Sequence, residues 1–410
     1  MKKTVCELFA GVGGFRLGLE KESNEWKTVW FSQWEPNKKK QWAHDCYVSH
    51  FGDIDDRTGI DISLVDKNEI PNHNLLVGGF PCQDYSVAKP LFDSKGLQGN
   101  KGVLWWQIRD TLQAKKPPFA LFENVDRLLK SPAKQRGRDF GVILSTLADL
   151  DYSVEWRVIN AAEYGAAQRR RRTFIFCYKN NTVYAKGLNA KEMDIQRKAV
   201  EVLSQTGFFA QAFPVYPCAN EDISDAQLSY EELSNVWKDF QFAFQNTGWM
   251  TNGMIYTAKN IPITEKSQTI RSLMEYHVDE KYFLTDTAKE RIAYLKSGKK
   301  IQRTAKNGHV YNFSEGPVAF PDSIDKPART MLTSETSINR STHVITDAET
   351  GKLRYLTPIE AERIQGFEDN WTGTVGMPHK FRYFCMGNAL VVPLITRMAH
   401  VLDDIFQHEE

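Results

Sequence analysis

The chain has 410 residues, of which 41% are hydrophobic and 25% are charged, and its formal net charge is +1. These values are ordinary for a globular protein and exclude a disordered or collagen-like chain. The length favours two domains, or one domain with a large insertion. The sequence contains neither an apolar stretch long enough to span a membrane nor a signal peptide, so we expect a cytoplasmic protein without membrane contact.

The cysteines and the local charge narrow the class further. The six cysteines are far apart and form no Cys-x-x-Cys pair, so we expect neither a structural metal nor a disulfide framework. Residues 289–309 hold seven Lys or Arg and one acid, whereas residues 221–239 hold six acids and one base. The basic run permits contact with phosphate groups, although such a run is more often a solvated face.

Short apolar runs alternate with amphipathic stretches from residue 5 to about residue 180. The runs that we expect to be strands are residues 5–9, 27–31, 74–78, 119–122, 153–158 and 173–176. Strands joined by helices predict an α/β fold with a doubly wound, largely parallel, Rossmann-like sheet. The rhythm is lost after residue 185.

Order returns near the C-terminus. Thr357, Pro358 and Glu360 are typical of an N-cap, a first helical position and an acidic first turn, and predict a helix that runs to Gln365. The apolar residues 388–405 predict a closing helix.

The first motif that carries chemistry is a glycine-rich turn after the first strand, from Phe9 through Gly11, Gly13 and Gly14. Glycines let the backbone approach a ligand and direct a helix N-terminus at an anionic group, which suits a nucleotide-like cofactor. The alternative is that the glycines have no ligand and only form the turn between the strand and the helix. After the second strand, Trp34 could cover an adenine ring and Glu35 could bind ribose hydroxyls.

The second motif is Pro81-Cys82, which follows the third strand through Gly78 and Gly79. Open α/β sheets bind ligands at the carboxyl ends of their strands, which is where this cysteine falls. The other cysteines fit the commoner role of small buried hydrophobes. The segment after Cys82 is rich in lysine and glycine, as expected of a lid over a substrate.

The third and fourth motifs also lie at strand ends. Glu123-Asn124 follows the fourth strand, and Gln168 begins a run of four arginines that leads into the sixth. Arginines at alternate positions of a strand point to the same face, so Arg170 and Arg172 could enter one site.

These four motifs, together with Gly387-Asn388-Ala389, occur in the order found in cytosine-5 DNA methyltransferases, and the chain resembles that family in its bacterial or phage restriction–modification branch. The resemblance covers about residues 1–185 and 350–410. It implies a catalytic domain formed by residues 1–185 and 350–410 and a target-recognition domain formed by residues 186–349. It also implies base flipping, because a base inside a duplex cannot reach such a site.

The resemblance implies an enzyme that transfers a methyl group from S-adenosylmethionine to C5 of a cytosine in double-stranded DNA, leaving S-adenosylhomocysteine and using no metal. Cys82 would add to C6 of the base, Glu123 would contact N3 and the amine, and Arg172 would hold the O2 side. Arg170 would stand beside Arg172, and Asn124 would support the Glu123 loop. A paired restriction endonuclease and a monomeric state are expected.

For the cofactor, the resemblance implies a set of residues drawn from several motifs: Phe9, Gly11, Gly13, Gly14, Trp34, Glu35, Asp61, Ile62, Pro81, Leu104, Asn388 and Ala389. The chain departs from the family pattern where the usual ribose acid before the tryptophan is Gln33, so either Gln33 or Glu35 could bind the ribose. Ala389 also replaces the usual serine.

Three alternatives are kept. An exocyclic-amine methyltransferase would use a motif similar to Pro117-Pro118-Phe119, but Lys116 cannot accept the amine hydrogen bond. A tRNA cytosine-5 methyltransferase shares the catalytic motifs, although its recognition segment is usually smaller. An inactive DNA-binding homologue is disfavoured by the intact Cys82, Glu123 and Arg172.

Overall fold

The computed structural model describes residues 1–80, 104–131, 135–190, 192–227, 242–304, 308–374 and 376–409. Packing divides the chain into two compact units. The first unit contains Met1–Tyr164, Arg171–Glu265 and Val392–Glu410, and the second contains Gly165–Arg170 and Lys266–Val391. The predicted domains cross these units, since residues 186–265 pack with the first unit and residues 350–391 with the second. As functional domains they stay a prediction.

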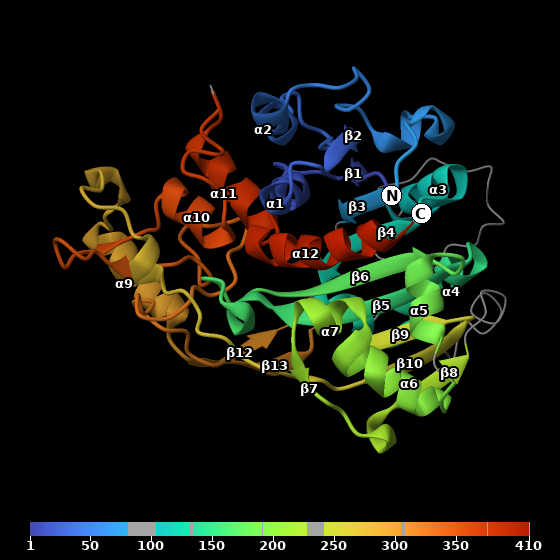
Figure 1. Cartoon of the computed structure of the whole chain (residues 1–410). Helices are drawn as coiled ribbons and strands as arrows, with labels where there is room; N and C mark the ends of the chain where they lie inside the picture. Colours follow the sequence, from blue (N-terminus) through green and yellow to red (C-terminus); the bar gives the residue numbers. More distant parts are fainter. Residues whose placement is uncertain are drawn as a thin grey trace. The chain divides into compact units, whose positions relative to one another are not determined.

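The first unit is built on a nine-stranded sheet with the order β2-β1-β3-β4-β6-β5-β9-β10-β8 (Figure 1). Its strands are β1 (Thr4–Leu8), β2 (Lys27–Ser32), β3 (Leu75–Gly79), β4 (Phe119–Val125), β5 (Tyr152–Asn160), β6 (Arg171–Lys179), β8 (Ser224–Gln227), β9 (Thr247–Thr251) and β10 (Met254–Ala258). All six predicted strands are present, and the α/β prediction is confirmed.

Strand direction changes at β4. The neighbours β2, β1, β3 and β4 run parallel, whereas β6 is antiparallel to both β4 and β5. The carboxyl ends of β1, β2, β3 and β4 therefore meet at one edge of the sheet, and the beginning of β6 lies at that same edge. Among the described residues, the glycine-rich turn, Gly79, Glu123 and Arg172 lie at this edge.

The helices of the first unit are α1 (Gly14–Glu22), α2 (Trp42–Phe51), α3 (Leu104–Lys115), α4 (Arg138–Asp149), α5 (Val183–Asn189), α6 (Ile195–Glu201), α7 (Phe208–Ala212) and α12 (Val392–His408). Those of the second are α9 (Asp286–Lys296), α10 (Pro358–Gln365) and α11 (His379–Asn388). The predicted closing helix was wrong at its start, because Asn388 ends α11 and α12 begins at Val392. No single helix among the described residues is long and apolar enough to cross a membrane, and only the bent pair α11 and α12 meets that test, by length and composition.

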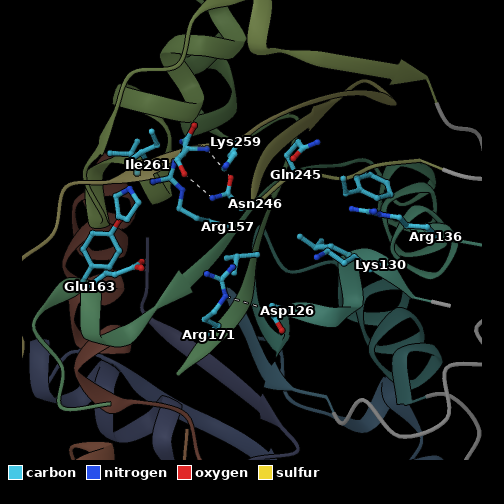
Figure 2. Close-up of a pocket in the computed structure, with 17 residues that line it drawn as sticks. Asp126, Lys130, Arg136, Arg157, Glu163, Arg171, Gln245, Asn246, Lys259 and Ile261 are labelled. Carbon is cyan, nitrogen blue, oxygen red and sulfur yellow. Dashed lines mark hydrogen bonds and ion pairs between the residues drawn. The ribbon is translucent and has the colours of Figure 1, made fainter. Parts of the chain in front are cut away.

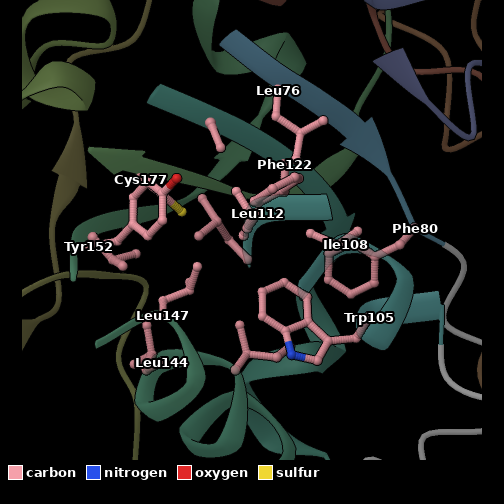
Figure 3. Packing of buried hydrophobic residues seen from close by; sticks show 14 of the residues in the cluster. Leu76, Phe80, Trp105, Ile108, Leu112, Phe122, Leu144, Leu147, Tyr152 and Cys177 are labelled. Carbon is pink, nitrogen blue, oxygen red and sulfur yellow. The ribbon is translucent and has the colours of Figure 1, made fainter. Parts of the chain in front are cut away.

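Two layers of helices cover the sheet. On one face, Trp105, Ile108 and Leu112 of α3 pack with Leu76 of β3 and Phe122 of β4 in a fully buried cluster (Figure 3). Strand side chains alternate in direction, so neighbouring residues of the same strands point to the opposite face.

There α12 packs against α1, and the ring of Phe406 lies 5.1 Å from that of Phe119 on β4. Apolar burial on both faces fixes the parallel strands and holds their carboxyl ends in place.

The strands β9 and β10 join the sheet from the segment that looked irregular in sequence. β9 pairs with β5, and close packing explains the glycine at the second position of β9. A Cβ on Gly248 would lie 1.9 Å from the Trp156 ring, so only glycine fits.

The second unit has little regular structure besides its helices. It contains two separate strand pairs, β12 (Lys299–Thr304) with β13 (Val310–Glu315) and β14 (Ile345–Thr346) with β15 (Leu353–Arg354). The short pair β7 (Val215–Tyr216) with β11 (Ile261–Pro262) belongs to the first unit.

The helix α10 begins as the sequence predicts. The Thr357 hydroxyl accepts from the Glu360 amide at 3.1 Å, and the Glu360 carboxylate accepts from the Thr357 amide at 2.9 Å. Arg354 donates to both oxygens of Glu360 at 2.8 Å, which compensates the buried carboxylate.

Candidate active site

The glycine-rich turn between β1 and α1 has the conformation that a close ligand contact needs. Gly11 and Gly13 have φ angles of 57° and 86°, where an L side chain is strained, and Phe9 also has a positive φ of 55°. A Cβ on Gly13 would lie 2.4 Å from the Phe51 ring, whereas a Cβ on Gly11 would meet nothing within 4 Å. Close packing thus requires a glycine at position 13, just before α1, whereas the backbone at Gly11 faces open space.

Gln33 holds this turn. Its side-chain Oε1 accepts a hydrogen bond from the backbone N–H of Gly11 at 2.7 Å. The backbone N–H of Gln33 donates to the Thr58 carbonyl. From the sequence we expected Gln33 to be a departure from the family pattern and a possible ribose ligand, and we missed this structural role. Its position directly after β2, at the edge where β1 also ends, was the available signal.

Glu35 lies in a different environment. Its Oε2 is buried and has no hydrogen-bond partner among the described residues, and burial raises the pKa of its carboxyl. An unpaired buried carboxylate oxygen is costly unless a ligand supplies a donor. Next to it, the indole of Trp34 is 38% exposed.

The other predicted cofactor residues are dispersed. Asp61 accepts from the Ser63 amide at 2.9 Å, while Ile62 is buried in the main core and Leu104, the first residue of α3, packs against it. Asn388 and Ala389, at the end of α11, belong to the second unit.

The structure brings Glu123 and Arg172 together. Val125 of β4 is paired with Arg172 of β6, which puts Arg172 diagonally across from Glu123 on the same face of the sheet. The Arg172 Nε lies 2.7 Å from the Glu123 Oε1, and both side chains are largely shielded from solvent. The two predicted residues thus form an ion pair at the end of β4.

Two neighbours fix this pair and the chain beside it. Gly79, the last residue of β3, leaves room for the Glu123 carboxylate, since a Cβ there would lie 3.3 Å from Oε2. The Asn124 Nδ2 donates to the carbonyl of Phe80 at 2.9 Å. Asn124 thereby ties the end of β4 to the residue at which β3 leads into Pro81 and Cys82. Pro81 and Cys82 themselves lie outside the described residues.

The cysteines that the structure describes are poor candidates for a nucleophile. Cys6 and Cys177 are completely buried inside strands, and burial raises the pKa of both thiols. Cys46 and Cys385 are buried within helices, and Cys218 is half-buried. A thiol that stays protonated is a weak nucleophile.

Arg170 is bonded to the backbone of the second unit. Its side chain is buried, and its guanidinium donates to the carbonyls of Met331 at 3.1 Å and Gly387 at 2.9 Å. These bonds hold the backbone that precedes Asn388.

The basic run of residues 289–309 is not exposed throughout, because Lys296 is buried and its Nζ lies 2.8 Å from Asp322.

A cavity of about 390 Å³ lies next to the Glu123–Arg172 edge, between the loops after β4 and β5 and the ends of β9 and β10. Its exposed cations are Lys130, Arg136, Arg171 and Lys259. Figure 2 shows Arg136 and Lys130 on one side, Lys259 near Asn246, and Arg171 paired with Asp126. The buried Arg157 donates to the carbonyls of Phe209 and Phe213 and is therefore occupied.

The described residues contain no group of three or more His, Cys, Asp or Glu that could hold a metal ion. A glycine-rich turn after β1 and an acid–arginine pair at the end of β4, all at one edge of a Rossmann-like sheet, define an α/β protein that binds its ligands at the carboxyl ends of the strands.

The comparison with known families specifies that class. Residues 3–404 match the model of the C-5 cytosine-specific DNA methylases. The chain belongs to this family and is a DNA cytosine-5 methyltransferase. The alternative of an exocyclic-amine methyltransferase is thereby wrong, and Lys116, with a φ of 48°, forms the turn before β4.

Individual relatives agree. The type II methyltransferase M.Sau3AI of Staphylococcus aureus is 51% identical over 98% of this chain and 96% of its own length. M.NgoBI of Neisseria gonorrhoeae is 35% identical over 44% of this chain and 52% of its own. The crystal structure of the S. pombe Dnmt2 methyltransferase superposes with a TM-score of 0.58 at 14% identity, covering 98% of this chain and 99% of that one, which shows the shared fold.

Proposed function

We propose that Glu123 and Arg172 form the pocket for the target cytosine and that Cys82 is the nucleophile. The observation that carries this proposal is the 2.7 Å ion pair at the end of β4, tied through Asn124 to the segment that leads into Cys82. An acid and an arginine side by side match the polar edge of cytosine, where an amine donor stands at one end and an O2 acceptor at the other. Glu123 would accept from the amine and act at N3, and Arg172 would donate to O2.

The chemistry explains why both charges are needed. Cytosine C5 is a poor nucleophile until the Cys82 thiolate adds to C6, which forms the S–C6 bond and moves electron density towards C5 and N3. Glu123 would stabilise that density by sharing a proton at N3, and Arg172 would stabilise it at O2. After C5 takes the methyl group, loss of the C5 proton breaks the S–C6 bond and frees Cys82.

S-adenosylmethionine supplies the electrophilic methyl group, and the described residues fit its adenosyl and methionine parts. The open space at Gly11 and the unpaired buried oxygen of Glu35 are the supporting observations. We propose that the turn from Phe9 to Gly14 receives the methionine end and that Glu35 accepts from the ribose hydroxyls.

The remaining cofactor residues have narrower roles in the proposal. Trp34 would cover the adenine, and Asp61 would accept at its edge. Ile62 and Leu104 would contribute apolar contact, and Pro81, Asn388 and Ala389 would border the methionine end. We assign Gln33 and Arg170 to positioning, because their hydrogen bonds hold backbone segments.

The DNA would be bound as a duplex from which the target cytosine is flipped, at a cost of a few kcal/mol of stacking and pairing. We propose that the exposed cations around the cavity beside the Glu123–Arg172 edge hold backbone phosphates and that residues 186–349 include the part that reads the target sequence. Given the type II methyltransferase among its relatives, we infer that the enzyme protects DNA against a paired restriction endonuclease and acts as a monomer.

The experiment that tests the pocket is methyl transfer to pooled-sequence duplex DNA by the variant Glu123→Gln. A glutamine still accepts from the amine but cannot share a proton at N3, so we expect the rate to fall by about 10²- to 10⁴-fold. Binding of S-adenosylhomocysteine should be unchanged. The exposed Glu280→Gln serves as the matched control and should retain the wild-type rate. Full activity of Glu123→Gln, or no methyl transfer by the wild type on any DNA, would contradict the proposal.

A further inference from the structure

The second unit contains an isolated two-stranded ribbon. β12 and β13 pair only with each other, in a regular antiparallel register from Lys299–Glu315 to Thr304–Val310. Because side chains alternate along a strand, the ribbon has two faces. We call inner face the side formed by Lys299, Ile301, Arg303, Tyr311, Phe313 and Glu315, and polar face the side formed by Lys300, Gln302, Thr304, Val310, Asn312 and Ser314.

Contacts of the inner face fix the root of the ribbon. The Lys299 Nζ donates to the carbonyl of Leu295, in the last turn of α9, at 2.8 Å. Arg340 lies 3.1 Å from the Glu315 carboxylate and also donates to the Leu295 carbonyl. Further out, the Arg303 guanidinium stacks on the Phe313 ring at 3.7 Å. The ribbon is thus attached at its base through Lys299 and Glu315 of the inner face, while Ile301, Arg303 and Tyr311 of that face remain exposed.

The polar face is free. Its six residues are all exposed, and no hydrogen bond or ion pair joins their side chains to the rest of the described chain. The face has no acid, and Gln302 stands directly opposite Asn312. Apart from the apolar Val310, the face offers one lysine, two carboxamides and two hydroxyl groups.

These groups match the edges of bases. A two-stranded ribbon fits into the major groove, where a carboxamide can bind N6 and N7 of adenine and a lysine can bind O6 and N7 of guanine. Resting on the proposed action on duplex DNA, we propose that the polar face of the β12–β13 ribbon reads the target sequence. Gln302 and Asn312 bind the adenines of A·T pairs in this proposal, and Lys300 binds a guanine.

The test compares the wild type with Gln302→Ala, Asn312→Ala and Lys300→Ala on a library of duplexes with randomised bases around a cytosine, read by bisulfite sequencing. The exposed Gln407→Ala on α12 is the matched control and should keep the wild-type preference. Each ribbon variant should lose discrimination at one or two defined positions, with a cognate rate about tenfold or more lower and an unchanged rate on the poorest sites. For the carboxamide variants these positions should be A·T pairs.

A second arm checks contact directly. Replacing the affected adenine by 7-deazaadenine removes the N7 acceptor, so it should slow the wild type and leave the corresponding variant unaffected. Unaltered preferences in all three variants, or a uniform loss at every sequence, would overturn the role of the ribbon while leaving the methyltransferase intact. A wild type that methylates no duplex would overturn the proposed function instead.

Discussion

At the residue scale, the site depends on carboxylates whose surroundings differ. Glu123 has a cation at 2.7 Å, Glu35 has a buried oxygen without a partner among the described residues, and Glu7 is buried within β1. Each environment allows a separate expectation. Glu123, which is paired with an arginine, suits contact with the target base. Glu35, whose buried oxygen has no partner among the described residues, suits contact with an uncharged hydrogen-bond donor such as a ribose hydroxyl. The fully buried Glu7 affects the stability of the fold.

The ribose assignment predicts a binding defect for Glu35→Gln. A hydrogen bond to a charged acceptor contributes about 1.5–3 kcal/mol, so the Kd for S-adenosylhomocysteine should rise by about tenfold or more, as measured by calorimetry. Gln33→Ala should weaken binding less, because it loosens the turn at Gly11 without removing a ligand contact. The assignment is wrong if Glu35→Gln binds normally while Gln33→Ala does not.

Glu7 predicts a dependence of stability on pH. Burial raises the pKa of its carboxyl to about 8 in the folded protein, against an opposing hydrogen bond from Tyr47. Between about pH 4.5 and pH 8 the folded state holds a proton that the unfolded state has lost, so the free energy of unfolding should fall as the pH rises through this range.

Glu7→Gln should remove the part of this dependence that Glu7 contributes, while the buried Glu155, whose pKa burial raises to about 7, keeps its own part. Urea unfolding should find the variant about as stable as the wild type at pH 5 and more stable by a few kcal/mol at pH 8.5. The exposed Glu280→Gln should follow the wild type at both pH values. An equal wild-type-to-Gln difference at the two pH values would exclude the titration of Glu7.

At the element scale, the site depends on strand ends held in register. Gly79 and Glu123 are directly paired across β3 and β4, and a Cβ at Gly79 would press on the Glu123 carboxylate. Gly79→Ala should therefore displace that carboxylate by a few tenths of an ångström and lower the methylation rate about tenfold. Its free energy of unfolding should change by no more than about 1 kcal/mol. Gly187→Ala on α5, where a Cβ meets nothing within 4 Å, is the control, and equal rates in the two variants would argue against the contact.

Much of this element-scale arrangement was predictable from sequence. The predicted strands carry their motifs at their ends, so Glu123 and Arg172 could be expected at one edge before their contact was known. The diagonal pairing and the space at Gly79 could not, because they depend on the register between β4 and its neighbours. Likewise, β9 pairs with β5 across about ninety residues, and its short sequence, with Gly248 at its second position, carries no local strand pattern.

At the scale of the whole molecule, DNA binding should depend on salt through the cations around the cavity. Removing Lys130 and Lys259 together should reduce the slope of log Kd against log salt concentration by about 1 to 2, since each phosphate contact contributes about 0.9. Lys186→Ala, on the exposed side of α5, should leave the slope unchanged. Fluorescence anisotropy with a short duplex measures the slope. Identical slopes in the wild type and the double variant would show that the cavity is not part of the DNA-binding surface.

The sequence also indicated which function to expect from the whole molecule, but not how its parts are assembled. The motifs identified the reaction, whereas residues 186–265 proved to extend the catalytic sheet rather than form part of a separate body. Sequence patterns describe local structure well and are silent about which distant segments pack together. The β12–β13 ribbon could be proposed to read the DNA target sequence only when the structure showed which residues share each of its two faces.

The most direct test of the central claim uses duplex DNA in which 5-fluorocytosine replaces cytosine, incubated with the enzyme and S-adenosylmethionine. Fluorine at C5 cannot leave as a proton does, so the S–C6 bond cannot break after methyl transfer. We predict a covalent protein–DNA adduct, stable on a denaturing gel, with the linkage at Cys82, and no adduct with Cys82→Ser. An adduct that survives Cys82→Ser, or a wild type that methylates ordinary cytosine but forms no adduct, would contradict it.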